Sequence, residues 1–215
     1  MFERYTEIAR RVIFSARYEA SQSGSPFIET EHLLLGLLRE DRTLAETFFG
    51  SPNALAEVWK KMELSSNKSS VAVDLPLGKA GKLVLAAAAN EADRLSSKSI
   101  STEHILLGLL YDETGLARQI LREYDLDLDS VREHLKKHRH APSLAQNYED
   151  PPEGVPPEIA ETLAKLRDVV RKMEEAIADR DFGKARAYSD EERVERAGLR
   201  ALCEKHGLES WRFRL

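Results

Sequence analysis

The sequence predicts an all-α fold built on a tandem repeat, and three observations support this prediction. The stretch Thr30–Leu38 returns 72 residues later as Thr102–Leu110, with eight of nine positions identical. The same offset holds without a gap through the preceding segment, where Val12 falls on Val84. Apolar residues recur at helical spacing, and no segment shows sustained period-two alternation, so the elements are expected to be helices.

The first copy of the repeat is expected to form four helices. They cover about residues 6–22, 30–38, 43–49 and 51–62, with Thr6, Thr30 and Ser51 as N-caps and Pro52 at a first helical position. The second of these helices is apolar nearly all round, so it should be central and buried. Its Gly36 is interpreted as a point of close packing between helices.

A polar connector at residues 64–70 separates the copies, after which the four-helix pattern restarts. The second copy is expected to form helices at about residues 81–95, 102–111, 116–124 and 129–138. Repeat one therefore covers about residues 2–64 and repeat two about residues 76–140, which together form a first domain, 1–140.

Composition changes after this domain. Five of the eight prolines lie in residues 141–157, which we interpret as a linker. A heptad spacing of apolar residues follows, on the positions Ile159, Leu163, Leu166, Val170, Met173 and Ile177. A turn at residues 181–183 and a second charged helix to about Lys205 complete an antiparallel hairpin, 158–207, followed by a tail, 208–215. This hairpin is expected to dimerise or to dock on a partner.

Charge and composition narrow the function classes. The net charge of −5 argues against a general nucleic-acid binder, because neutralising phosphates requires a clustered positive surface. The single cysteine, Cys203, excludes an internal disulfide framework and suits a reducing compartment. Its side chain is interpreted as a packing residue. The opening residues contain no secretory signal, and the longest apolar run is too short to span a bilayer. A cytoplasmic protein with no membrane partner is expected.

The histidines are weighed against acid–base and metal chemistry. His32 and His104 follow the two repeated glutamates, but with no nucleophile or second acid nearby they are interpreted as buried structural groups. His134, His138 and His140 resemble a ligand set, yet basic residues surround them and suit a solvated helix end. We therefore expect no catalytic residue, no metal and no cofactor.

The twin segments TEHLLLGLL and TEHILLGLL closely resemble the double-repeat N-terminal domain of Clp/Hsp100 unfoldases, particularly the ClpC type. The resemblance covers about residues 2–140 and implies a pseudo-twofold bundle of eight helices that receives substrates or adaptors for an unfoldase working with the ClpP protease. A phosphate-binding loop is missing: at Gly81-Lys82, Leu83 replaces the Ser or Thr and Pro76 takes the place of the first glycine. The chain therefore looks like the receptor part of an unfoldase, standing alone without ATPase modules.

The same resemblance implies a binding site for phosphoarginine or a basic peptide. In ClpC-type domains, acidic residues at the positions of Glu31 and Glu103 act together with a threonine in the first helix of each repeat. Carried over by position, Thr6 and Glu31 make the first site, and Glu103 makes the second, where Gly78 replaces the threonine. The alternative is that Thr30-Glu31 and Thr102-Glu103 only cap their helices and complement the helix dipole.

A second resemblance concerns the hairpin. Residues 176–185 with the acidic run from Asp190 look like the UVR motif, a helical hairpin of ClpC middle domains and other partner-binding proteins, although Tyr188 and Ser189 depart from its pattern. The tail carries Trp211, Phe213 and Leu215, which are expected either to dock on a partner or to fold back on the hairpin.

The sequence thus predicts a non-enzymatic substrate-binding or adaptor protein of the Clp system. Its expected partners are client proteins or adaptors, a Clp unfoldase or ClpP, and a second copy of the chain through the hairpin. The alternatives are an accessory subunit that docks on the ClpP core, a UVR-type interaction factor unrelated to proteolysis, and a small histidine-centred hydrolase or metalloprotein.

Overall fold

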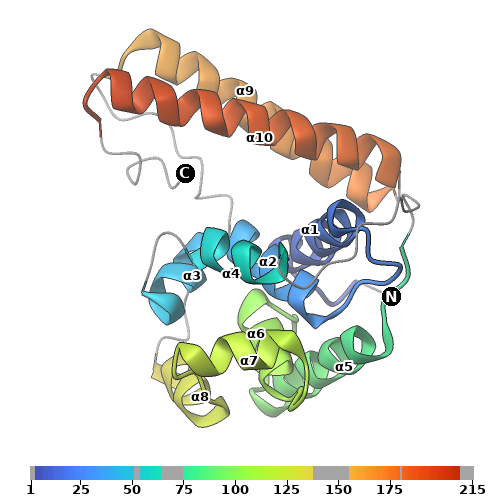
Figure 1. Ribbon diagram of the computed structural model, residues 1–215. Helices are drawn as coiled ribbons and strands as arrows, with labels where there is room; N and C mark the ends of the chain where they lie inside the picture. Colours follow the sequence, from blue (N-terminus) through green and yellow to red (C-terminus); the bar gives the residue numbers. More distant parts are fainter. Residues whose placement is uncertain (1–2, 51–53, 64–74, 138–154, 180, 209–215) are drawn as a thin grey trace. The chain divides into compact units, whose positions relative to one another are not determined.

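A computed structural model describes residues 3–50, 54–63, 75–137, 155–179 and 181–208. Across these ranges the protein is all-helical, with ten helices and two isolated β-bridges (Figure 1). The helices are α1 (Glu7–Ser23), α2 (Thr30–Glu40), α3 (Arg42–Phe49), α4 (Ala54–Glu63), α5 (Lys79–Arg94), α6 (Thr102–Leu110), α7 (Leu116–Glu123), α8 (Leu128–Lys137), α9 (Pro157–Ala178) and α10 (Phe182–Lys205). The predicted all-α class is confirmed.

The chain divides into two compact units, Met1–Ala141 and Pro142–Leu215. The first unit contains α1 to α8 around one continuous hydrophobic core. At the centre of this core, the side chains of α2 and α6 are buried on nearly every face, as their apolar sequences predict. None of the described helices is long and apolar enough to cross a bilayer.

Each of the central helices pairs in antiparallel fashion with the helix before it. On α1, Ser23 lies 3.0 Å from His32 near the start of α2, and Ser15 donates a hydrogen bond of 2.5 Å to Glu40 at the end of α2. The end of α2 therefore lies beside the middle of α1, and the two helices run in opposite directions. In the second copy, α5 and α6 pair in the same way.

Two glycines set the distance within these helix pairs. A Cβ atom on Gly36 would overlap the carbonyl oxygen of Val12 on α1, and one on Gly108 would overlap that of Val84 on α5. Both pairs are separated by the same 72 residues, so the close approach is repeated in each copy. The predicted packing role of Gly36 is confirmed, and Gly108 has the same role.

The two copies are joined crosswise at their helix starts. The amide of Thr6 donates to Ile100, and the amide of Ile100 donates to Arg4, at 3.0 and 2.7 Å. Their counterparts are hydrogen bonds of 2.9 Å from Ile28 to Pro76 and from Gly78 to Ile28. The residue preceding the first helix of each repeat is thus held against the residue preceding the second helix of the other.

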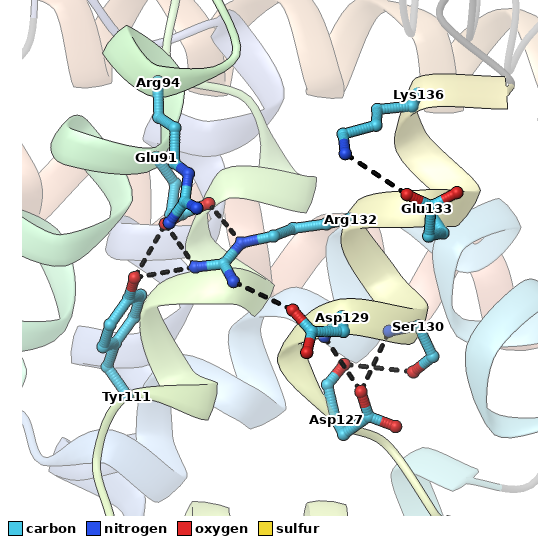
Figure 2. Close-up of polar contacts among 9 residues, drawn as sticks. All are labelled: Glu91, Arg94, Tyr111, Asp127, Asp129, Ser130, Arg132, Glu133 and Lys136. Carbon is cyan, nitrogen blue, oxygen red and sulfur yellow. Dashed lines mark hydrogen bonds and ion pairs between the residues drawn. The ribbon is translucent and has the colours of Figure 1, made fainter.

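A buried carboxylate is neutralised in each copy. In the second copy, Arg132 of α8 lies between Glu91 of α5 and Tyr111, with nitrogens 2.7 and 2.9 Å from the Glu91 oxygens and 2.8 Å from the tyrosine hydroxyl (Figure 2). The Glu91 side chain is 2% exposed, and the guanidinium lowers the pKa of this carboxyl. In the first copy the corresponding Glu19 pairs with Arg39 of α2 at 3.1 Å.

The second unit is the antiparallel hairpin of α9 and α10, which run side by side in Figure 1. Its core cluster consists of Ile159, Leu163, Leu166, Leu199 and Cys203. Most of the heptad seam is buried as predicted, but Ile177 is only partly buried and Val169 and Ala176 are buried instead.

The turn of the hairpin lies earlier in the chain than the sequence suggested, because α9 ends at Ala178 and α10 begins at Phe182. The expected turn at residues 181–183 is in fact the start of α10, because the Asp181 side chain caps the helix by accepting a hydrogen bond of 3.1 Å from the Lys184 amide.

We expect Gly36→Ala and Gly108→Ala each to lower the free energy of unfolding by about 2–3 kcal/mol, because the added methyl group meets backbone that cannot move aside. Chemical denaturation followed by circular dichroism measures the effect. Gly198→Ala in α10 is the control: nothing lies within 4 Å of its Cβ position, so this change should stabilise its helix by about 0.5–1 kcal/mol. Equal effects at all three positions would contradict the close-packing role.

Candidate functional site

The two helices that carry the repeated Thr-Glu-His sequence have N-caps one residue earlier than expected. The N-caps are Glu29 and Ser101, both with extended backbone, rather than the predicted Thr30 and Thr102. The two threonines are instead the first helical residues, and both are buried. Sequence reasoning missed this because the capping partner is a histidine at the third helical position.

His32 and His104 act as caps for the backbone. The Nδ1 atom of His32 accepts a hydrogen bond of 3.0 Å from the amide of Glu29, and that of His104 accepts one of 3.0 Å from the amide of Ser101. In neutral His32 the proton is then on Nε2, which donates to Ser23 at 3.0 Å. Both rings are buried, and burial lowers the pKa of His32 to about 4 and also lowers that of His104. The predicted burial and hydrogen bonding of both histidines are confirmed.

A first group of polar side chains surrounds the start of α6. The α6 cluster consists of Thr6, Asp41, Ser101, Thr102 and Glu103. The Thr102 hydroxyl donates a hydrogen bond of 2.6 Å to Asp41, whose other carboxylate oxygen caps α3 by accepting from Leu44 at 2.9 Å. Thr6 caps α1 next to Ile100, so its hydroxyl side chain lies at the same end of the bundle. Residues of both repeats therefore build this cluster.

A second group surrounds the start of α2. The α2 cluster consists of Glu29, Thr30, Glu31, Gly78 and Asp112. Gly78 is held against Ile28, and the Glu29 carboxylate occupies the space that a side chain on Gly78 would need. Asp112 packs against Gly115, next to the Thr30 hydroxyl. Again the residues come from both repeats.

Negative charge accumulates in both clusters. The pKa of Glu31 is raised by burial and further by Glu29 and Asp112, and the pKa of Glu29 is raised by burial and by Asp112. In the α6 cluster, burial raises the pKa of Asp41, with a smaller contribution from Glu103. Both clusters are thus suited to a cationic group, which would relieve these unfavourable interactions.

Most of the chain matches the model of a known protein family. Residues 4–72 and 78–178 match the family model of the Clp repeat (R) N-terminal domain. The chain belongs to this family. The match extends beyond the bundle of the Clp N-domain through α9 of the hairpin.

Similar sequences are found in Clp chaperone subunits. A ClpA homolog described as an ATP-dependent Clp protease ATP-binding subunit, from Guillardia theta, is 38% identical over 135 residues, covering 61% of this chain and 16% of that protein. The chloroplastic chaperone protein ClpC1 from Oryza sativa subsp. japonica is 37% identical over 137 residues, covering 61% of this chain and 15% of that protein. The Clp N-domain chain thus spans about one-sixth of the length of these relatives.

Solved Clp-type N-terminal domains share the fold. The N-terminal domain of the chaperone ClpD from Arabidopsis thaliana has a TM-score of 0.52 at 29% identity and covers 65% of this chain and 97% of its own. The Hsp104 N-terminal domain from Candida albicans has a TM-score of 0.53 at 18% identity and covers 66% of this chain and 95% of its own. The second likeness concerns the fold alone.

The predicted pairing of Thr6 with Glu31 is wrong. Because α1 and α2 are antiparallel, Thr6 and Glu31 lie at opposite ends of α1, a 17-residue helix that is about 25 Å long. The crossed hydrogen bonds instead bring Thr6 to the helix that carries Glu103, and Gly78 to the helix that carries Glu31. Sequence reasoning also missed Glu29, Asp41 and Asp112, of which only Asp41 carries a recognisable signal, as an Asp before a helix.

Of the remaining sequence candidates, His134 and Cys203 lie within the described part of the chain. His134 makes an edge contact with the Phe48 ring, with centroids 5.0 Å apart, whereas His138, His140, Trp211, Phe213 and Leu215 lie outside the described residues. Cys203 is buried in the hairpin core, where burial raises the pKa of its thiol. The described part of the chain holds no group of three metal-ligating side chains.

We expect acid to destabilise the bundle through His32. The unfolded chain binds a proton at this residue below about pH 6.5, whereas the folded chain does so only near pH 4. Stability should therefore fall as the pH drops through this window, by on the order of 3 kcal/mol.

The variant His32→Asn tests this effect, because an amide oxygen can still accept the Glu29 hydrogen bond but does not titrate. Denaturation curves at pH 7.5, 5.5 and 4.5 should show a clearly smaller loss for the variant. The raised carboxyl pKa values act in the opposite direction, but they are common to both proteins. Parallel curves for the two proteins would contradict the assignment.

Proposed function

We propose that this Clp N-domain chain is a non-enzymatic protein-binding module of the Clp chaperone–protease system, recognising client proteins or adaptors for an ATP-dependent unfoldase. The observation that carries the proposal is the pair of acidic clusters, each at a helix start and each shared between the repeats. In each, a partly exposed glutamate, Glu31 or Glu103, makes no ion pair within the described ranges. Each accepts a long hydrogen bond from the preceding threonine, and Glu31 also accepts one from its own backbone amide. Such carboxylates are free to bind a cationic side chain of a client.

The two clusters supply the groups that a phosphoarginine or basic-peptide ligand requires. A carboxylate pairs with the guanidinium group, while a hydroxyl donor and the backbone amides of a helix start suit a phosphate. The α6 cluster offers this full set through Glu103 and through Thr6 at the start of α1. We therefore assign ligand binding to Thr6 and Glu103 together, with Glu31 as the carboxylate of the other cluster.

The hairpin and tail are proposed to contact the proteolytic machinery. Docking on a Clp unfoldase or on the ClpP core, and pairing of two chains through α9 and α10, remain predictions from the charged hairpin and its heptad seam. The role of Trp211, Phe213 and Leu215 as partner anchors also remains a prediction, as does the cytoplasmic location expected from the single cysteine.

The client-binding role predicts that a double variant, Glu31→Gln with Glu103→Gln, loses at least about tenfold of captured clients, because each charge-assisted contact contributes roughly 1.5–3 kcal/mol. The measurement is a quantitative pull-down with the intact chain from its native cell extract. The matched control, Glu161→Gln with Glu204→Gln, removes two exposed charges from the hairpin and should leave capture unchanged. Undiminished capture by the first variant would argue against the clusters as client sites.

The docking role predicts a separate loss. Changing Trp211, Phe213 and Leu215 to Ala should reduce recovery of a Clp unfoldase or ClpP at least about fivefold without affecting clients, since buried aromatic anchors typically contribute about 2 kcal/mol. The same pull-down measures both quantities. Recovery of nuclease-complex proteins and of no Clp component would favour a UVR-type factor instead.

A further inference from the structure

A single residue forms the corner between α2 and α3. Because α2 ends at Glu40 and α3 begins at Arg42, Asp41 is both the C-cap of the first helix and the N-cap of the second. One oxygen of its carboxylate, Oδ1, accepts a hydrogen bond of 2.9 Å from the amide of Leu44. The start of α3 therefore fixes the orientation of the Asp41 side chain.

The other oxygen of this carboxylate reaches the second repeat. Oδ2 of Asp41 accepts a hydrogen bond of 2.6 Å from the hydroxyl of Thr102, which is the first residue of α6 and is 2% exposed. This hydroxyl has one proton, and the carboxylate of Glu103 lies farther away, at 3.4 Å. A short, charge-assisted bond that is shielded from water is stronger than a neutral one. One carboxylate thus holds the starts of two helices that belong to different repeats.

The corresponding corner of the second repeat is built differently. Residues 111–115 separate α6 from α7, and the N-cap Gly115 has no side chain to cap the helix. Asp112 in this corner accepts a hydrogen bond of 3.4 Å from the amide of Thr114. Its Oδ2 atom accepts none in the described part of the chain, although the Thr30 hydroxyl at the start of α2 lies beside the same glycine. The carboxylate of this corner therefore joins neither helix start to the other.

The other contacts of the two central helix starts do not distinguish them in this way. The crossed backbone hydrogen bonds at Ile28 and Ile100 occur at both starts. The contact of His32 with Ser23 joins α2 to α1 within the first repeat. The bond to Asp41 is thus a side-chain connection between the repeats at the start of α6, and it has no counterpart at the start of α2.

We propose that Asp41 is a latch between the two repeats, which couples local opening of the start of α3 to local opening of the start of α6. Proteins open in cooperative units, and a shared carboxylate places these two helix starts in the same unit. The starts of α7 and α2 are not coupled. The inference concerns the fold and does not depend on the proposed function.

The test is native-state hydrogen exchange of the intact chain, followed by NMR. The variant Thr102→Val replaces the hydroxyl by a methyl group of similar size. It should speed exchange of the Ile105 amide in α6 at least about fivefold, because a hydrogen bond to a charged group is lost. Exchange of the Leu44 amide, in the other repeat, should rise at least about twofold through the coupling. Both changes are measured relative to the amide of the buried Leu121 in α7, which corrects for any change in global stability.

The matched control is Thr30→Val, the same substitution at the equivalent position of the first repeat. It should leave exchange of the Gln119 amide, which bonds to Gly115 at the start of α7, unchanged. An unchanged Leu44 amide in Thr102→Val would overturn the proposal. So would an acceleration of Gln119 in Thr30→Val that equals the acceleration of Leu44.

Two variants of Asp41 separate the hydrogen bonds from the negative charge. In Asp41→Asn, the amide oxygen can accept from Leu44 while its NH₂ group donates to the oxygen of Thr102, so exchange at Leu44 and Ile105 should stay near that of the unchanged chain. Asp41→Ala removes both bonds and should speed exchange of both amides at least about fivefold. Equal exchange in the two variants would contradict the latch.

Discussion

The contact of two glycines with a neighbouring backbone is the constraint on which the bundle depends. Gly36 and Gly108 let α2 and α6 approach α1 and α5 so closely that a single methyl group would overlap a carbonyl oxygen. This approach allows the apolar residues of α2 and α6 to be buried on nearly all sides, so that one core is shared by both repeats. The starts of α2 and α6 are thereby fixed in position, and with them the carboxylates of Glu31 and Glu103.

The buried charges show how a repeat can preserve a requirement while changing its solution. Glu19 and Glu91 occupy the same position in the two copies, and each would be costly to bury without a partner. In the first copy, Arg39 of the adjacent helix supplies the positive charge. In the second copy a tyrosine, Tyr111, stands at the position of Arg39, and the guanidinium comes from Arg132 of α8. Both copies thus bury a glutamate that is paired with an arginine, but the arginine comes from a different position in each copy.

Much of the fold could be predicted from local patterns, and the errors arose where contacts are not local. Helical spacing and the repeat gave the helices of both copies, and the position of Gly36 gave its packing role. The caps at Glu29 and Ser101 were missed because a histidine side chain, rather than a glutamate, satisfies the backbone amide. The pairing of Thr6 with Glu31 was wrong because it assumed that residues of the same repeat form one site. Backbone hydrogen bonds between the repeats, which leave no trace in one sequence, place them apart.

The crossed hydrogen bonds at Ile28 and Ile100 also bear on the origin of the duplication. A single repeat contains one half of each cluster, so an ancestral chain with one repeat would have completed its clusters only as a symmetric homodimer, with two identical sites. Two copies within one chain are not required to remain identical. Each site could then accumulate its own substitutions, and the exchanges at Gly78 and Glu29 are what such independent evolution of two formerly identical sites would leave.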